Sequence, residues 1–331
     1  MDPVTHLAAG ALGGKLAQSR FGKRQLFWFC VTAAWLPDID NLLGMLGPEG
    51  YLLYHRGITH SVFGGLALAL MLAGAFRLFS KTFPFREGIL IAYACIILHI
   101  FLDLITSYGT LIFFPLTRAR YTLNSIFIID PFYTFTMIVF LVAAKRWKNH
   151  ASRIVLGGLL WVLLYPAAAF GINRALTGYY TARFEREGMS YERIELSTEP
   201  FSPFRWKLIV EDESSYHLAG VNTFDPGREL GFETHSKPPP QLIEELGEKV
   251  SMLNTFLWFA RYPVMRYDNN SEKTRLRFND MRFYSTLGFL KRRSDGASAP
   301  FALVIELDKS GKPLNWQYRR PRGSMVIHYI E

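Results

Sequence analysis

The chain has 331 residues, a formal net charge of +9 and 50% hydrophobic residues. A basic balance can indicate a nucleic-acid partner, but the Lys and Arg residues form short loop clusters, with no continuous basic stripe and no recognisable reader motif. We therefore expect no nucleic-acid partner. The two cysteines, Cys30 and Cys95, both fall in apolar runs, so we expect no disulfide framework. No basic segment precedes a Leu-rich stretch at the start, so we expect no cleavable signal peptide.

Composition divides the chain into two parts. Residues 1–178 are dominated by Leu, Ile, Phe, Ala and Gly, whereas residues 179–331 are charged, rich in aromatic residues and interrupted by prolines. We expect the boundary between Tyr179 and Arg186. The predicted fold is an α-helical integral membrane domain with about six membrane-associated helices, followed by a small β-rich α+β soluble domain.

Three segments are close to the length of about 20 apolar residues that a membrane-spanning helix needs: Ser61–Phe79, Gly88–Ile105 and Ile154–Asn173. A fourth, Pro131–Ala144, reaches that length if it begins at Ile126. Val4–Ala17 and Gln25–Leu36 are shorter helices that cover only about 20 Å, so we expect them to pack against the longer ones through small residues.

Loop charges predict the orientation in the membrane. Ten Lys and Arg residues lie in the loops after the first, third and fifth segments: Arg20, Lys23, Arg24, Arg77, Lys81, Arg86, Lys145, Arg146, Lys148 and Arg153. The alternate loops, 37–60 and 108–130, hold only Arg56, Arg118 and Arg120. Because cytoplasmic loops carry the Lys and Arg excess, we expect a multi-pass inner (cell) membrane protein with these alternate loops and the C-terminal domain outside the cytoplasm.

The C-terminal part shows strand-like runs separated by turns. We expect strands at Arg205–Val210, Arg275–Arg282 and Phe301–Glu306, with a hairpin loop at residues 308–312 leading into Leu314–Arg319. Apolar residues at helical spacing predict one helix over Pro240–Arg261.

Histidine and aspartate residues gather in the apolar part. His6, His55, His60 and His99 are accompanied by Asp38, Asp40, Asp103 and Asp130. Imidazole and carboxylate groups are the usual ligands of zinc and of manganese or iron ions. His99 and Asp103 are four residues apart in an apolar helix, so both face one side and can grip one ion, or can simply pair with each other. The predicted orientation places all eight residues toward the outer face.

Two short motifs precede that helix. Leu36-Pro37-Asp38-Ile39-Asp40 places two carboxylates after a helix, where a solvated turn is the alternative. In the run His55–Ser61, Gly57 permits a turn that brings both histidines inward. Arg56 can hold an anionic group such as phosphate, or contact a lipid headgroup at the surface. His6 is the least certain ligand, and Asp130 suits a helix cap.

These motifs resemble the YdjM-type family of membrane-bound metal-dependent hydrolases, often described as a domain of unknown function. The matching residues are Thr5-His6, Leu36–Asp40, His55–Ser61 and His99–Asp103, and the tail adds a similarity around Phe259–Val264. More remotely, the order of ligands is similar to zinc-dependent phospholipase C and S1/P1-type nucleases. That similarity implies ligand roles for His6, Asp40, His55, His99 and Asp103. The absence of a histidine between Asp103 and His150 departs from that pattern, so we expect one or two ions rather than three.

The leading hypothesis is a membrane-bound metal-dependent hydrolase that cleaves an ester or phosphoester with metal-activated water. The expected cofactor is one or two divalent ions, zinc first, with manganese and iron as alternatives. Membrane lipid is the expected partner, and a phospholipid or other ester the substrate. The residues concerned are metal ligands His6, Asp40, His55, His60, His99 and Asp103, with Asp38, His60 and Arg56 in catalysis. The alternatives are a metal-ion or solute transporter, and a structural or receptor protein whose helices a metal staples.

Overall fold

The computed structural model describes residues 1–22, 24–269, 273–294, 299–320 and 324–330, so Lys23 of the basic loops lies outside the described residues. The chain forms two compact units. The first holds residues 1–42, 54–173 and 200–203, and the second holds residues 43–53, 174–199 and 204–331. The N-terminal part is helical and the C-terminal part is rich in β-strands, as the composition predicts.

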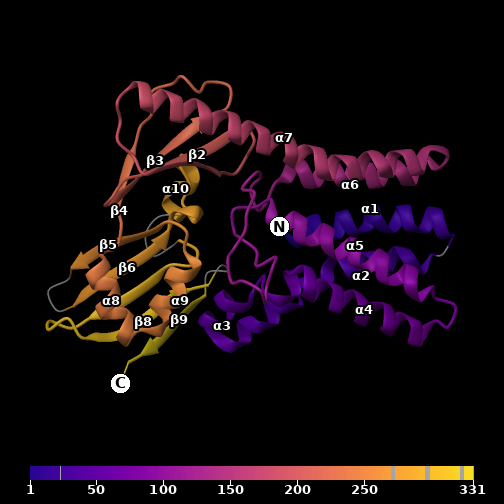
Figure 1. The fold of residues 1–331 in the computed structure, drawn as a ribbon, viewed down its shortest axis with the longest axis horizontal. Helices are drawn as coiled ribbons and strands as arrows, with labels where there is room; N and C mark the ends of the chain where they lie inside the picture. The colour runs from indigo at the N-terminus through magenta and orange to yellow at the C-terminus, as the bar shows by residue number, and fades with distance from the viewer. Residues whose placement is uncertain (23, 270–272, 295–298, 321–323, 331) are drawn as a thin grey trace. The chain divides into compact units, whose positions relative to one another are not determined.

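The first unit is a bundle of helices that run alongside one another (Figure 1). Its long helices are α1 (Pro3–Phe21), α2 (Gln25–Trp35), α4 (Val62–Phe79), α5 (Phe85–Leu104), α6 (Pro131–Arg146) and the first part of α7 (Ala151–Arg186). Short 3₁₀ segments connect some of them: η1 (Leu36–Leu46), η2 (Ile58–His60) and η3 (Lys148–His150). Helix α3 (Gly47–Tyr54) lies within the second unit, apart from its last residue.

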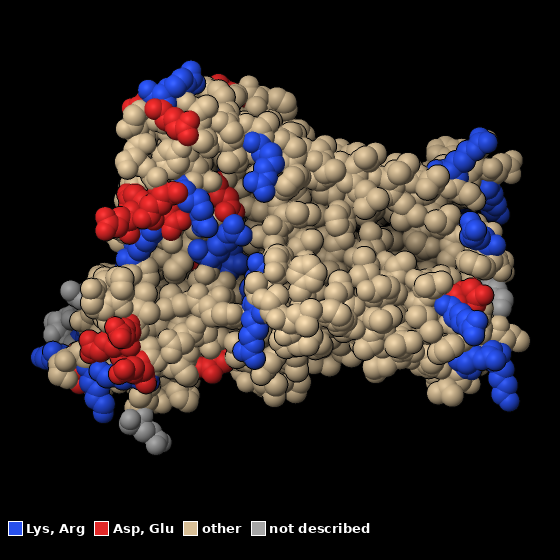
Figure 2. Space-filling model, viewed as in Figure 1, with Lys and Arg blue, Asp and Glu red and all other residues tan. Residues whose placement is uncertain are grey.

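Three of the described helices are long and apolar enough to cross a membrane: Val62–Phe79, Phe85–Leu104 and Lys148–Arg186. They cover the three spans that the sequence predicts, except the end residues Ser61 and Ile105. In Figure 2 the visible face of this bundle is almost free of charged residues, and Lys and Arg gather at the end where α1 turns into α2, α4 into α5 and α6 into α7. A total of six membrane-associated helices stays a prediction.

Helix α6 begins at Pro131, so the predicted extension of this segment back to Ile126 is wrong. Asp130 is the N-cap: its side chain accepts a hydrogen bond from the Tyr133 amide. A proline disfavours helical geometry in the residue before it and suits the first position of a helix, which explains the start at this point.

Small residues let the first helices approach closely. At Gly10 of α1, an added Cβ would lie 2.5 Å from the Cβ of Ala34 in α2. Helix α2 packs in turn on α5, where Phe29, Cys30 and Ala33 join a buried cluster with Ile96. The start of α1, the end of α2 and the end of α5 are therefore held together at one end of the bundle, away from the basic turns.

The second unit contains two antiparallel sheets. One has the order β1-β2-β3-β4 and the other the order β5-β6-β7-β8-β9. The strands are β1 (Arg193–Thr198), β2 (Arg205–Glu211), β3 (Ser215–Asn222), β4 (Glu233–Ser236), β5 (Pro263–Asn269), β6 (Thr274–Asp280), β7 (Leu303–Leu307), β8 (Pro313–Arg319) and β9 (Met325–Tyr329). The other elements are α8 (Pro240–Lys249), α9 (Ser251–Phe259), η4 (Met281–Phe283) and α10 (Gly288–Ser294).

Strands β2, β6, β7 and β8 confirm the four predicted runs to within two residues at each end. The single helix predicted over Pro240–Arg261 is wrong. Two helices, α8 and α9, meet at Val250, whose backbone is extended with φ −131°. The apolar periodicity is the same on both sides of this break, so it does not reveal it.

Candidate metal centre

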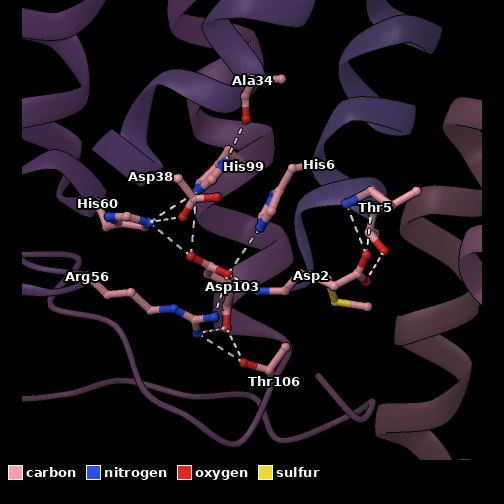
Figure 3. A network of polar contacts seen from close by, with 12 residues as sticks. Asp2, Thr5, His6, Ala34, Asp38, Arg56, His60, His99, Asp103 and Thr106 are labelled. Carbon is pink, nitrogen blue, oxygen red and sulfur yellow. Dashed lines mark hydrogen bonds and ion pairs between the residues drawn. The ribbon is translucent and has the colours of Figure 1, made fainter. Parts of the chain in front are cut away.

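Four side chains meet at one end of the helical bundle and could together hold a metal ion: Asp38, His60, His99 and Asp103. Each offers one ligand atom, and these atoms lie within 4.8 Å of one another. Asp38 comes from η1, His60 ends η2, and His99 and Asp103 lie one turn apart near the end of α5. Figure 3 shows the side chains converging from these elements.

The two imidazoles face each other. His60 Nε2 lies 3.0 Å from His99 Nε2 and 3.1 Å from Asp103 Oδ2. His99 Nε2 lies 3.5 Å from the same carboxylate oxygen. Asp38 Oδ1 lies 3.7 Å from His60 Nε2 and 3.8 Å from His99 Nε2. Two nitrogen and two oxygen donors thus surround one small volume, a donor set that suits zinc, manganese or iron.

The other nitrogen of each imidazole is held by an acceptor. His99 Nδ1 donates to the backbone carbonyl of Ala34 at 2.7 Å, and His60 Nδ1 lies 3.0 Å from Asp40 Oδ2. Because a carbonyl or carboxylate oxygen only accepts, the proton of a neutral ring is on Nδ1 and the Nε2 lone pair points into the cluster. Such second contacts orient histidine ligands in metal sites. Two facing lone pairs repel unless a proton or a metal cation lies between them, so the residues present fit a metal ion.

Asp40 faces away from this volume. Its Oδ1 lies 2.9 Å from His55 Nδ1, and its Oδ2 accepts from the Arg56 amide at 2.8 Å and the Thr59 hydroxyl at 2.9 Å. Burial raises the pKa of this carboxyl group, but the hydrogen bonds from His55 and His60 outweigh it and hold the pKa well below its usual range. Asp40 is therefore an ionised carboxylate that ties the loop 55–60 to η1.

His60 stands where positive charge is favoured. Burial alone would lower its pKa, but the carboxylates of Asp103, Asp38 and Asp40 raise the pKa to about 10. A cluster of buried carboxylates that favours a proton on one imidazole also favours a divalent cation beside it. The charge of the site thus agrees with its donor set.

Arg56 forms an ion pair with Oδ1 of Asp103, the outer oxygen of this carboxylate, which faces away from His60 and His99. Its Nη2 is 2.8 Å from Asp103 Oδ1, and its Nη1 donates to the Thr106 hydroxyl at 3.2 Å. The guanidinium also lies 4.6 Å from the centre of the Tyr108 ring. The Arg56 side chain is 4% exposed, so its positive charge is already paired with Asp103 inside the protein. Of the two carboxylate oxygens, Oδ2 is the one directed at His60 and His99.

His6 stacks on the cluster from α1. Its ring lies 3.7 Å from that of His99 at an interplanar angle of 17°, and its Nε2 is 3.4 Å from Asp103 Oδ1. The side chain is fully buried, yet apart from this contact with Asp103 neither ring nitrogen has a hydrogen-bond partner among the described residues. A buried imidazole nitrogen without a hydrogen bond is costly, which suits a position beside a metal ion. The amino group of Met1 contacts Asp103 as well.

Local chain geometry sets these positions. Ser61 caps α4 by accepting from the Gly64 amide at 2.9 Å. At Gly64 an added Cβ would collide with the carbonyl oxygen of Ile58, so only glycine lets the 55–60 loop fold back on the helix start. Arg56 has a φ of +57°, in the left-handed region, which turns the chain between His55 and Gly57.

The structure brings seven of the predicted residues into one linked network: His6, Asp38, Asp40, His55, His60, His99 and Asp103. Asp130 is not part of it, because its carboxylate caps α6 and accepts from the Tyr165 hydroxyl at 2.9 Å. The ligand roles of His6, Asp40 and His55 stay predictions, as do the catalytic roles of Asp38, His60 and Arg56. Sequence reasoning missed the contacts of Ala34 and Thr106, which carry no motif.

Comparison with known proteins agrees with the helical part. The chain is 27% identical over 306 residues to the uncharacterized protein YfhP of Bacillus subtilis (strain 168), covering 86% of this chain and 88% of that protein. No solved structure matches the chain. The profile of the YdjM inner membrane protein family matches residues 1–175, which include the whole histidine and aspartate cluster. With more than half of its length matched, this chain belongs to the YdjM inner membrane protein family.

Proposed function

We propose that this protein is a membrane-bound metal-dependent hydrolase that cleaves an ester or phosphoester at the outer face of the membrane. The observation that carries the proposal is the buried set of two histidines and two aspartates around one small volume. Zinc is the proposed ion, with manganese and iron as alternatives, because imidazole and carboxylate donors suit all three.

A divalent ion in such a site supplies Lewis-acid chemistry: it lowers the pKa of water from about 16 to about 7 and polarises the scissile bond. The protein's own residues prepare the site. Asp40 and the Ala34 carbonyl fix the two imidazoles with Nε2 inward. Arg56 neutralises the outer oxygen of Asp103. The ligands in this proposal are Asp38, His60, His99 and Asp103, with His6 beside them.

Asp38 is the group that substrate would meet first. Its side chain is 13% exposed, whereas those of His60, His99 and Asp103 are at most 1% exposed. A carboxylate at the exposed edge can accept a proton from the attacking water, provided that it lies within hydrogen-bond reach. Asp38 is therefore the proposed general base, in addition to its place in the donor set.

The residues of this cluster lie at the end of the bundle where α1 begins and α5 ends, and the Lys and Arg residues of the turns gather at the other end (Figure 2). An ion pathway would need polar groups that continue along the helices. We therefore propose an enzyme rather than a transporter, with the cluster and the C-terminal domain outside the cytoplasm, as the loop charges suggest.

Metal analysis of the detergent-purified full chain tests the proposal, with wild type beside His99→Ala and with Asp130→Asn as control. We expect bound metal in wild type and the control and its loss in His99→Ala. A panel of phosphodiester and carboxylester substrates should then show turnover that His99→Ala abolishes. Metal binding without turnover of any ester would contradict the hydrolase, and unfolding on metal removal would favour a structural staple.

A further inference from the structure

The approach to the candidate metal centre, the four side chains Asp38, His60, His99 and Asp103, runs along η1. Of the four candidate ligands, only Asp38 has a side chain that is more than 1% exposed, at 13%. The faces of His60, His99 and Asp103 that do not point into the cluster are covered by neighbouring residues. Anything that reaches the donor atoms from outside must therefore pass Asp38 and the residues beside it.

The residues beside Asp38 are apolar and exposed. A 3₁₀ helix has three residues per turn, so every third side chain lies on one face. Pro37 and Asp40 form the buried face of η1. Ile39 and Leu42 share the next face and are 42% and 63% exposed. Asp38 thus lies between a buried face and a face of exposed aliphatic side chains.

The flanking elements continue this surface. Trp35, which ends α2 directly before η1, is 47% exposed. On the segment that carries His60, Ile58 is 47% exposed and Phe63 is 49% exposed. Five large apolar side chains thus stand on, or within three residues of, η1 and η2, the elements that carry the two ligands outside α5. Such a surface marks a contact with a membrane or an apolar ligand rather than with water.

The membrane is the occupant that the structure favours. Helix α4, which begins at Val62 two residues after His60, is one of the apolar helices able to cross a membrane, and Leu66 and Leu70 continue its exposed apolar side. Ile58 and Phe63, the apolar residues on the His60 side, are thus continuous along the chain with a helix able to cross a membrane. Tryptophan at such a position is typical of the boundary between headgroups and hydrocarbon.

We infer that the candidate metal centre opens laterally into the lipid headgroup layer. Its substrate is then a membrane lipid whose ester or phosphoester bond lies at headgroup depth. This inference rests on the proposed hydrolase function. The acyl chains remain in the bilayer beside Ile39, Leu42 and Trp35, and the polar bond reaches Asp38. A short, water-soluble ester carries the same bond but lacks the chains that these side chains would contact.

The first experiment measures lipid exposure and needs no activity. Single cysteines for a nitroxide label replace Ile39 and Leu42 in the full chain in vesicles, with buried Cys30 and Cys95 changed to alanine. Leu70→Cys on α4 is the lipid control and Arg118→Cys the water control, since both residues are exposed. We expect collision rates with oxygen at 39 and 42 to resemble those at 70. Values that match position 118, with high access to a water-soluble nickel complex, would overturn the inference.

The second experiment compares two probes with the same bonds: dioleoyl phosphatidylglycerol in vesicles and dihexanoyl phosphatidylglycerol as dissolved monomers. The double variant Ile39→Asn/Leu42→Asn should lose about tenfold in kcat/KM on the vesicle lipid, equivalent to about 1.4 kcal/mol, and little on the soluble probe. Equal losses on both probes, or none, would refute lateral access and leave the hydrolase standing. If wild type cleaves neither probe while positions 39 and 42 face lipid, the hydrolase proposal loses support and the lipid-facing opening remains.

Discussion

His60 and His99 approach through their Nε2 atoms, 3.0 Å apart, although they come from separate elements 39 residues apart in the chain. Their Nδ1 atoms are held by different acceptors, a carboxylate for His60 and a backbone carbonyl for His99. The carboxylate, Asp40, can be altered by substitution without touching the proposed donor atoms.

Asp40→Asn should weaken metal binding without abolishing it. The amide can no longer stabilise a positive site or accept from all its donors, and loss of such an outer partner typically costs about 10- to 100-fold in metal affinity. Titration of metal-free protein with a competing zinc chelator measures the change. Asp38→Asn and Asp103→Asn should reduce affinity further, and an Asp40 variant as weak as these would assign Asp40 to the ligands instead.

Arg56→Gln should destabilise the metal-free protein. It leaves the buried Asp103 carboxylate without its guanidinium partner, and breaking one side of a buried pair typically costs about 3 to 5 kcal/mol. Saturating zinc should recover part of the loss, because the ion supplies positive charge to the same carboxylate. The apparent Tm in detergent, with and without zinc, measures both effects. A Tm equal to that of wild type in chelator would contradict the role given to Arg56.

Gly64→Ala should disturb the loop that carries His60. The added methyl group would collide with the backbone carbonyl of Ile58, and overpacking of this kind typically costs about 1 to 3 kcal/mol. Gly74→Ala in the same helix is the matched control, because no atom lies within 4 Å of its added Cβ, and it should be neutral or more stable. Tm and zinc affinity should both fall in the first variant. Equal behaviour of the two would refute the packing argument.

The stability of the C-terminal unit should rise with pH in the alkaline range. Burial lowers the pKa of Lys207 to about 8 against the opposing charge of Glu199, from an ordinary value of 10.5. Between these values the unfolded chain binds more protons than the folded one, so stability increases with pH, by at most about 3 kcal/mol. Thermal unfolding from pH 7.5 to 10.5 should show this rise, and Lys207→Met should lose it. Lys249→Met, on exposed α8, should keep the wild-type slope.

The proposed orientation can be checked by labelling in intact cells. A cysteine at exposed Arg118 should react with a membrane-impermeant maleimide, whereas one at exposed Lys148 should react only after the membrane is broken. The natural Cys30 and Cys95 are buried and should contribute little background. The reverse pattern would place the metal cluster on the cytoplasmic side.

Apolar length and helical spacing carried much of the prediction. The three spans follow from uninterrupted apolar runs, and the shared face of His99 and Asp103 follows from four-residue spacing in a helix. The sequence could not decide which carboxylate of Asp38 and Asp40 meets the histidines. Side chains two positions apart diverge on a 3₁₀ helix, and no 3₁₀ helix was predicted at this point from the sequence.

Contacts formed by the backbone could not be predicted from the sequence either. The backbone carbonyl of Ala34 orients His99, and every residue type has such a carbonyl, so the identity of the residue does not indicate the contact. The break at Val250 falls within a regular apolar pattern, and strand β9 has mostly exposed side chains that give no burial signal. In each case tertiary packing decides a feature for which the local sequence has no preference.

All four candidate ligands precede residue 104 in a chain of 331 residues. During synthesis the last of them is therefore added to the chain when less than a third of the protein has been made. The ion can bind while both sheets are still untranslated. Metal supply during membrane insertion, rather than after folding, would then set how much protein is made in its loaded form.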